Sequence, residues 1–421
     1  MAIRRTTICC SAVALTALLT ASARAQTPAP STRPVKQTRA ADDKTPLALF
    51  PVANVWTLPL NSALTAPPAF RDAFAVFALE GEQLAAYDLA AGSRAWLVSA
   101  STKVEPVIGA DAVFIAEEDA IAALSRRGGD VVWRQPFEAE LAVAPIVDGD
   151  RLIVATADGD VIAFRAVDGR ELWRRRLPRA ASSRPAVTPT RLFVATADKQ
   201  IVALDADTGT IVWTRSLSGI GHDILAVNDR IFLGSQDRFF YCLRVTDGEI
   251  EWRWPTGADA IGLPTADDRS VYFVSLDNVL RGLNQSNGVQ QWKGALSFRP
   301  ISGPLKWSET LVVAGTTPLL QAFSVRQGKS VGRYAVSSEL SAPPYLFTDP
   351  KRVFPVLVTI SSDIVGRATV TAATRDIEPE AAAMVPLPDV VAMSPMPNPP
   401  ADLGGVSPLP NLTRVDPTAE P

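Results

Sequence analysis

Leu204-Asp-Ala-Asp-Thr-Gly209-Thr-Ile-Val-Trp213 decides the fold, because related stretches return through most of the chain. Copies in which Trp follows Gly by four residues occupy residues 87–96, 124–133, 164–173, 243–252 and 283–292. The glycines of the series stand at 92, 129, 169, 209, 248, 288 and 328, so the successive steps are 37, 40, 40, 39, 40 and 40 residues. A period of about 40 residues indicates a repeat architecture, in which each unit is one small structure that stacks on its neighbours.

Each repeat contains the same series of segments. A short segment that usually carries a proline comes first, and a run of apolar residues follows it, at 74–79, 113–116, 152–155, 192–195, 231–233, 271–274, 311–314 and 353–360. These runs do not alternate between apolar and polar residues, which predicts strands buried on both faces. A polar turn, a third strand and the glycine turn come next, and a fourth strand carries the Trp. Glycine suits this last turn because a tight hairpin needs a positive φ angle.

Four short strands in about 40 residues, joined by hairpins, predict the blade of a β-propeller. The predicted fold class is therefore all-β, with four-stranded antiparallel blades. A helical repeat of the same length is excluded, because no window of about 11 residues between turns keeps a helical apolar period.

The strands of each kind give the number of blades. First, second and third strands each number eight if residues 366–371 supply the last third strand, and the fourth strand at 330–334 has Gly332 in place of Trp. The last repeat has no fourth strand of its own, whereas residues 49–56 carry Trp56 without a repeat before them. We therefore predict that the strand at Trp56 completes the last blade and closes a ring of eight, since closure removes exposed sheet edges. Seven blades are the alternative if the last repeat does not fold.

The two ends of the chain differ from the repeats. Residues 1–25 have a basic start, an apolar run at 8–19 and the sequence Ala23-Arg-Ala25, which is typical of a secretory signal peptide cleaved after Ala25. The apolar run is too short to span a bilayer, so we expect a periplasmic or secreted protein with no transmembrane segment after cleavage. Residues 26–46 are predicted to be a flexible leader, 47–374 the propeller, and 375–421 a proline-rich disordered tail.

Composition bounds the chemistry. A net charge of -3 gives no signature of nucleic-acid binding. Cys9 and Cys10 fall in the predicted signal peptide, so the mature chain keeps only Cys242, which we expect in the core without a disulfide. His222 is the only histidine, and its loop position predicts a surface or central-channel residue and not a catalytic one. We therefore predict no catalytic residues, no metal ligands and no cofactor-binding residues.

One local concentration of charge stands out. Five arginines lie on and beside the link between two repeats: Arg174, Arg175, Arg176, Arg179 and Arg184. Such links lie on one face of a propeller, where the cations could dock an acidic partner loop or a phosphate-bearing envelope component. A solvated link with no partner is the alternative interpretation.

The Asp/Asn-x-Gly-x-x-x-Trp strings resemble the pyrroloquinoline-quinone-type propeller repeat, and the resemblance covers residues 47–374. In that family the repeated Trp docks between neighbouring blades. The resemblance implies this role for Trp96, Trp133, Trp173, Trp213, Trp252 and Trp292, and we assign it also to Trp56. A Trp at one fixed place per blade can bury about 150–250 Å² between sheets.

Two branches of the family imply different functions. Quinone-dependent alcohol and glucose dehydrogenases carry a calcium site, an active-site acid and often an adjacent cysteine pair, whereas the only such pair here is Cys9-Cys10. The second branch is the propeller component of the outer-membrane β-barrel assembly machinery, an exported eight-bladed scaffold. The chain resembles this branch more, although it lacks the lipid-anchoring cysteine and has a proline-rich end.

We therefore expect an exported, non-enzymatic, monomeric propeller that acts as a scaffold for protein–protein interaction in the cell envelope, without a cofactor. Outer-membrane protein assembly is the process that the resemblance implies. A dehydrogenase that binds pyrroloquinoline quinone with calcium is the alternative. A ligand-binding sensor that uses the central channel is a second alternative, for which the sequence gives no signal either way.

Overall fold

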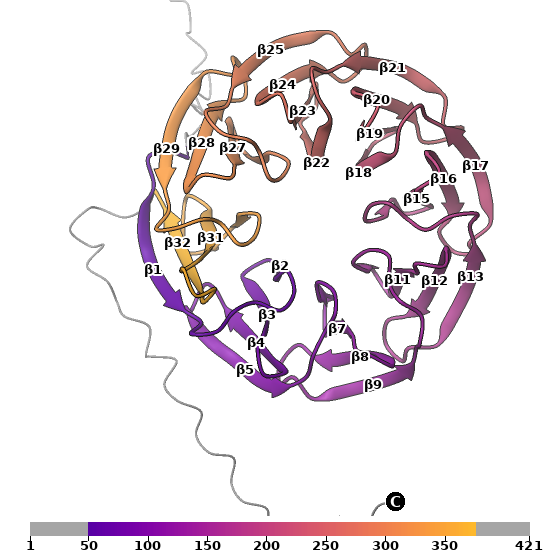
Figure 1. Ribbon diagram of the computed structural model, residues 1–421, viewed down its shortest axis with the longest axis vertical. Helices are drawn as coiled ribbons and strands as arrows, with labels where there is room; N and C mark the ends of the chain where they lie inside the picture. The colour runs from indigo at the N-terminus through magenta and orange to yellow at the C-terminus, as the bar shows by residue number, and fades with distance from the viewer. Residues whose placement is uncertain (1–48, 376–421) are drawn as a thin grey trace, which may run out of the picture. The chain divides into compact units, whose positions relative to one another are not determined.

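The computed structural model describes residues 49–375, which form eight four-stranded antiparallel sheets arranged as a ring of blades (Figure 1). Within these residues all regular secondary structure is β-strand or turn, with no helix. The prediction of an all-β propeller with eight four-stranded blades is confirmed. The predicted signal peptide, the leader and nearly all of the tail lie outside the described residues.

Strand position within a blade sets distance from the central axis. The first, innermost strands are β2 (Ala69–Arg71), β6 (Val107–Ile108), β10 (Ile146–Asp148), β14 (Ala186–Val187), β18 (Gly221–Val227), β22 (Ala260–Ala266), β26 (Leu305–Trp307) and β30 (Tyr345–Phe347). The second strands are β3 (Phe74–Leu79), β7 (Ala112–Ala116), β11 (Arg151–Ala155), β15 (Arg191–Ala195), β19 (Arg230–Ser235), β23 (Ser270–Ser275), β27 (Thr310–Ala314) and β31 (Val356–Ser362).

The outer half of each blade is built in the same way. The third strands are β4 (Gln83–Asp88), β8 (Ala120–Ser125), β12 (Asp160–Arg165), β16 (Gln200–Asp205), β20 (Phe239–Arg244), β24 (Val279–Asn284), β28 (Leu319–Ser324) and β32 (Ala368–Thr374). The fourth strands are β5 (Ser93–Ser99), β9 (Val131–Pro136), β13 (Glu171–Arg176), β17 (Ile211–Ser216), β21 (Ile250–Pro255), β25 (Gln290–Ala295), β29 (Ser330–Ala335) and β1 (Ala53–Pro59). We number the blades from 1, which begins with β2, to 8, which contains β1.

Burial follows this order and explains the sequence pattern. Every residue of β3 is buried, because the second strand has a sheet neighbour on each side and a blade packed on each face. In the outermost strands, such as β17, exposed residues are interleaved with partly buried ones. The continuous apolar runs are therefore the inner strands, and the mixed segments that end each repeat are the rim.

The first strand of the chain completes the last blade, as predicted. β1 pairs antiparallel with β32, with Trp56 opposite Ala372 and Leu58 opposite Val370. The strand order of blade 8 is β30-β31-β32-β1, so the ring closes between segments from the two ends of the described chain. This pairing selects eight blades over the alternative of seven.

The exact bounds of two predicted strands in blade 8 were wrong. The run predicted from Val353 begins as a strand only at Val356, because Asp349 accepts a hydrogen bond from the Lys351 amide and organises a turn there. The third strand, predicted at 366–371, spans Ala368–Thr374. Before it, Asp363 accepts hydrogen bonds from the amides of Val365 and Arg367 and holds a turn.

The repeated glycine is required for two reasons. Gly209 has a φ angle of 66°, in the left-handed region that disfavours a side chain. A Cβ atom at Gly209 would also run into the indole ring of Trp173 from the preceding blade. The same contact joins Gly248 to Trp213. The glycine therefore serves its own turn and provides the surface on which the neighbouring tryptophan packs.

We expect Gly209→Ala to lower the free energy of unfolding more than Gly149→Ala. Gly149 also has a positive φ, 58°, so both variants carry backbone strain of about 1 kcal/mol. Nothing lies within 4 Å of a Cβ at Gly149, whereas a Cβ at Gly209 meets Trp173, and overpacking adds about 1–3 kcal/mol. Urea denaturation of the two variants measures the difference; equal losses would show that the indole contact does not require glycine.

Candidate functional site

Each blade has two ends, and together these ends form the two faces of the ring. Because successive strands alternate in direction, the turns between strands 1 and 2 and between strands 3 and 4 share one face, which we call the hairpin face. The turns between strands 2 and 3 share the other face with the links to the next blade, and we call it the link face. In blade 3 the Leu177 amide of the link donates to Gly159 in such a turn.

The repeated tryptophans bond each blade to the next one. Six indole N–H groups donate to a backbone carbonyl of the following blade at 2.8–3.1 Å: Trp96 to Arg126, Trp133 to Ala166, Trp173 to Ala206, Trp213 to Val245, Trp252 to Gln285 and Trp292 to Val325. Trp56 is partly buried against a cluster that joins strands of blades 8 and 1. The energetic role of these residues in holding the blades together stays a prediction, which stability measurements test.

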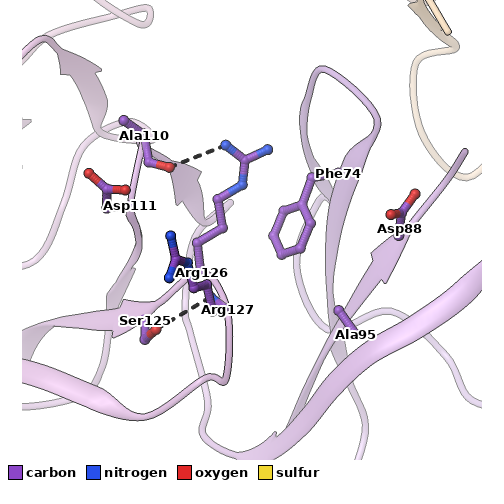
Figure 2. A pocket seen from close by; sticks show the side chains of 8 residues that line it. All are labelled: Phe74, Asp88, Ala95, Ala110, Asp111, Ser125, Arg126 and Arg127. Carbon is purple, nitrogen blue, oxygen red and sulfur yellow. Dashed lines mark hydrogen bonds between the residues drawn. The ribbon is translucent and has the colours of Figure 1, made fainter. Parts of the chain in front are cut away.

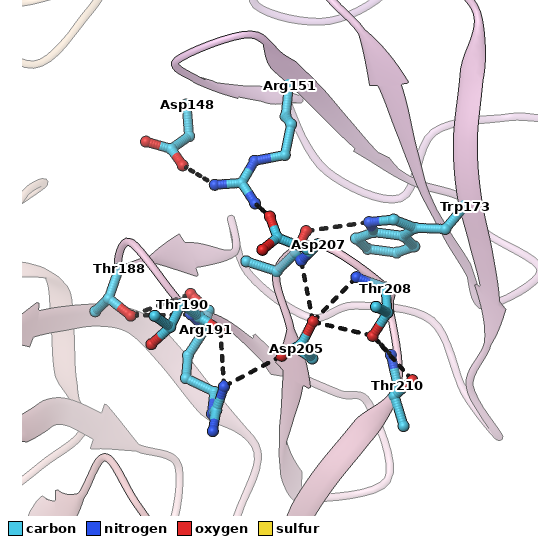
Figure 3. A network of polar contacts seen from close by, with 11 residues as sticks. Asp148, Arg151, Trp173, Thr188, Thr190, Arg191, Asp205, Asp207, Thr208 and Thr210 are labelled. Carbon is cyan, nitrogen blue, oxygen red and sulfur yellow. Dashed lines mark hydrogen bonds and ion pairs between the residues drawn. The ribbon is translucent and has the colours of Figure 1, made fainter.

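A charged network on the hairpin face crosses between blades 3 and 4 (Figure 3). Arg151 contacts Asp148 of its own blade at 2.8 Å and Asp207 of the next blade at 2.7 Å, and its side chain is 13% exposed. Hydrogen bonds from Thr208, which closes the same turn, lower the pKa of Asp205 below its ordinary value. The carboxylates of these turns are engaged in organising the blades.

A pocket of about 630 Å³ lies between blades 1 and 2 on the hairpin face (Figure 2). Arg126 lies over the Phe74 ring at 4.8 Å and donates to the Ala110 carbonyl. Asp88 accepts hydrogen bonds from the amides of Ala90 and Ala91 in its turn. The pocket is lined by Phe74, Asp88, Ala95, Ala110, Asp111, Ser125, Arg126 and Arg127. Arg126 and Asp88 therefore already have partners within the fold.

Two of the five arginines singled out in the sequence meet one carboxylate on the link face. Arg174 and Arg176 approach the same oxygen of Asp160, at 3.4 and 3.3 Å. Arg174 also pairs with Glu171 at 2.8 Å. Much of the positive charge at the end of β13 is therefore balanced within blade 3.

The other three arginines have different surroundings. Arg175 donates from Nε to the Gly209 carbonyl at 2.7 Å and so bonds blade 3 to blade 4. Arg179 is exposed on the link. Arg184 pairs with Glu105, which lies 79 residues earlier at the start of blade 2. The structure therefore distributes the five arginines over several environments.

Arg184 belongs to a charged group beside the central axis that the sequence interpretation missed. Glu105, Arg184 and Asp223 occupy the same repeat position, directly before the first strand or within its first residues, in blades 2, 4 and 5. His222 precedes Asp223, and its Nε2 is buried without a hydrogen-bond partner. We call these four residues the axial cluster. The sequence held a sign of this cluster: the residue directly before the first-strand proline is charged in some repeats, and a comparison of that position across repeats would have pointed to Glu105.

Burial changes the acidity of both carboxyls in the axial cluster. It raises the pKa of Glu105, and Arg184 offsets part of that rise. It also raises the pKa of Asp223, again offset in part by Arg184 and less by His222. Two carboxylates therefore share one guanidinium in a partly desolvated place.

Cys242 is the one free cysteine among the described residues, and it is fully buried in β20. Burial raises the pKa of its thiol, which keeps the sulfur protonated and unreactive at neutral pH. Residues 49–375 contain no group of three or more His, Cys, Asp or Glu side chains placed to hold a metal ion. The same residues contain no helix that could span a membrane.

The family model of outer membrane protein assembly factor BamB matches residues 117–222 and 215–343, more than half of the 421 residues. The chain belongs to this family. Two curated BamB proteins are each 26% identical to it. The match to BamB of Yersinia pestis spans 124 residues, which are 28% of this chain and 32% of the relative. The match to BamB of Legionella pneumophila strain Paris spans 129 residues, which are 30% of this chain and 33% of the relative. The chain therefore matches about a third of the length of these relatives.

Solved structures share the propeller fold of this chain. BamB from Moraxella catarrhalis has a TM-score of 0.63 and 18% identity, over 77% of this chain and 100% of that one. The quinohemoprotein alcohol dehydrogenase from Comamonas testosteroni has a TM-score of 0.59 and 12% identity, over 78% of each chain. At these identities the similarity shows the fold alone, which both kinds of protein use.

Proposed function

We propose that this protein is a non-enzymatic scaffold of the bacterial envelope that binds a protein partner during outer-membrane protein assembly, and that it works in the periplasm after export. The observation that carries the proposal is the match of the BamB family model over residues 117–343. The eight-bladed ring supports it, because such a ring offers two broad rigid faces built from turns and links. The role in assembly is inferred from the relatives, which are outer membrane protein assembly factors.

The link of blade 3 is the surface that we propose for partner docking. Arg176 is 61% exposed even though it approaches Asp160, and Arg179 is exposed beside it. Exposed guanidinium groups can exchange a screened internal pair for a bidentate contact with a partner carboxylate. Arg174, Arg175 and Arg184, the other three arginines of the set, already have contacts within the ring.

Reversing charge on this link is expected to weaken partner capture without unfolding the protein. We expect the double variant Arg176→Glu, Arg179→Glu to lower recovery of cross-linked outer-membrane assembly proteins from envelope extract at least fivefold, because each reversal makes a complementary contact repulsive. Arg326→Glu is the matched control, since Arg326 is 67% exposed and pairs with Glu309 on the opposite face. Undiminished recovery with the double variant would remove this docking surface. Failure of the unaltered chain to recover any assembly protein would contradict the proposed function.

A quinone-dependent dehydrogenase is the second candidate, favoured only by the shared fold with the Comamonas enzyme. The described residues present no cluster of carboxylates arranged for a calcium ion, so they do not fit this cofactor. Adding pyrroloquinoline quinone and calcium to the purified chain discriminates the two candidates. If the chain binds the chromophore and reduces the dye, it is a dehydrogenase and the scaffold proposal is wrong.

A further inference from the structure

At one repeat position on the link-face side of the first strands, charged residues are confined to part of the ring. The inner strands of the blades surround this axis (Figure 1). In blade order, the residues that stand at the repeat position of Glu105 are Pro67, Glu105, Ala144, Arg184, Asp223, Leu263, Gly303 and Pro343. Charge is thus confined to blades 2, 4 and 5, and blades 6, 7, 8 and 1 have no ionisable side chain at this position.

Small side chains in blade 3 let distant residues meet. The position between Glu105 and Arg184 is Ala144, whose methyl group is too short to separate them. Arg184 can therefore extend past blade 3 and pair with Glu105. The side chains are 44% and 24% exposed, so the pair lies at a surface that solutes can reach.

The cluster carries more hydrogen-bond acceptors than its own donors satisfy. Arg184 is hydrogen-bonded to Glu105, whereas its influence on Asp223 is through charge alone. Within residues 49–375 the Asp223 carboxylate receives no hydrogen bond from another side chain or amide. Next to it, the His222 Nε2 is buried and unpartnered, which is costly unless something supplies a partner. The cluster therefore sets two carboxyl groups, those of Glu105 and Asp223, against the single guanidinium of Arg184.

Exposed aliphatic side chains stand in the two blades that follow Asp223 around the ring, and Leu263 holds the repeat position of Asp223 in the first of them. Leu263, in the next blade after Asp223, is 52% exposed, which is unusual for a leucine on an inner strand. Ile301, in the link to blade 7, is 37% exposed. A ligand that joins a cationic nitrogen to a short methylene chain matches a carboxylate followed around the ring by exposed aliphatic groups.

We propose that the axial cluster binds a primary alkylammonium group, such as a lysine side chain, with the ammonium at the Asp223 and Glu105 carboxylates and the methylenes against Leu263. An ammonium supplies three donors to acceptors that the fold leaves open and adds a second cation beside the two carboxyl groups. A guanidinium is less suitable, because Arg184 already occupies the planar site at Glu105. This binding is a property of the folded chain and does not depend on the proposed assembly partner.

The single histidine gives a direct probe of the site. In the full chain labelled with ¹³C only at histidine, His222 supplies one imidazole Cε1–H resonance. Titration with Nα-acetyl-lysine methylamide at neutral pH is expected to shift this resonance saturably. Its norleucine counterpart, which lacks the ammonium, is expected to leave it unmoved. Tighter binding of cadaverine than of the lysine derivative would assign the site to free diamines, and the reverse order to lysines of a protein.

Two substitutions are expected to change the affinity in opposite directions. Asp223→Asn is expected to weaken binding about tenfold, since it removes a charged acceptor. Arg184→Gln is expected to tighten it, because it removes the competing cation from Glu105; loss of folding would not produce that gain. Glu140→Gln, on an exposed position of the link to blade 3, is the matched control with no change expected. The proposal is overturned if the resonance shows no saturable shift, or if Asp223→Asn binds as the unaltered chain does.

Discussion

A chain that lacks residues 49–60 is expected to lose the closure of the ring and most of its resistance to heat. The deletion removes four side chains that are at most 4% exposed, namely Leu49, Phe50, Leu58 and Leu60. Burial of each contributes about 1.5–3 kcal/mol, so the sum approaches the total stability of an ordinary domain, about 5–15 kcal/mol. It also leaves β32 as an unpaired edge strand.

The effect is best followed at blade 8, which lies at the far end of the sequence. Hydrogen exchange of the amides in β32 is expected to lose protection in the truncated chain, and a synthetic peptide of residues 49–60 is expected to restore it. A full-length pair provides the control: Leu58→Asp puts a charge into the core, whereas Thr57→Asp lies on the exposed side of the same strand. Unchanged melting temperature after the deletion would overturn the closure of the ring by β1.

Trp173→Ala is expected to lower the free energy of unfolding by about 3–5 kcal/mol. The indole is 8% exposed, packs on Gly209 of the next blade and donates to the Ala206 carbonyl at 3.1 Å. Its removal therefore leaves a cavity between blades 3 and 4 and an unpaired buried carbonyl. Trp173→Phe keeps most of the ring but loses the donor, and a cost of about 1–3 kcal/mol is expected.

Chemical denaturation followed by circular dichroism measures both variants, since the substitutions alter fluorescence directly. Leu172→Ala in the same strand is the control, because Leu172 is 38% exposed and its truncation should cost well under the loss at Trp173, about 0.5 kcal/mol. If Trp173→Ala and Leu172→Ala were equally stable, the repeated tryptophan would not hold neighbouring blades together.

The sequence was sufficient for the architecture because a propeller repeats one local pattern. Apolar runs marked the buried second strands within one or two residues in seven blades. The exception was blade 8, where a turn held by Asp349 delays the strand to Val356. Side-chain hydrogen bonds in the preceding turn decide where such a strand begins. The apolar side chain of Val353 carried no information about those hydrogen bonds.

The candidate sites were less predictable, since they depend on neighbours from different repeats. The sequence drew attention to Arg184 and His222, but it paired Arg184 with a run of arginines nearby in the chain. In the structure its partner is Glu105, two blades away. A ring brings residues that hold the same repeat position together around its axis. The partners of Arg184 are therefore found by comparing this position between repeats, and not by looking along one link.

Gly332 illustrates the difference between what the sequence determined and what only the tertiary structure decided. The sequence alone determined the period and the strand types, because turn residues and burial of both faces are local requirements that recur in each repeat. It predicted eight blades closed by the strand at Trp56, and the pairing of β1 with β32 decided between eight and seven. From the sequence, Gly332 was only the residue that stands where the other repeats have a tryptophan. The tertiary structure shows that a Cβ there would meet the Phe50 side chain, which the segment before β1 brings against blade 7. Long-range packing decided both the contact of Phe50 with Gly332 and the pairing of Arg184 with Glu105. No local pattern specifies which distant side chain fills a given space.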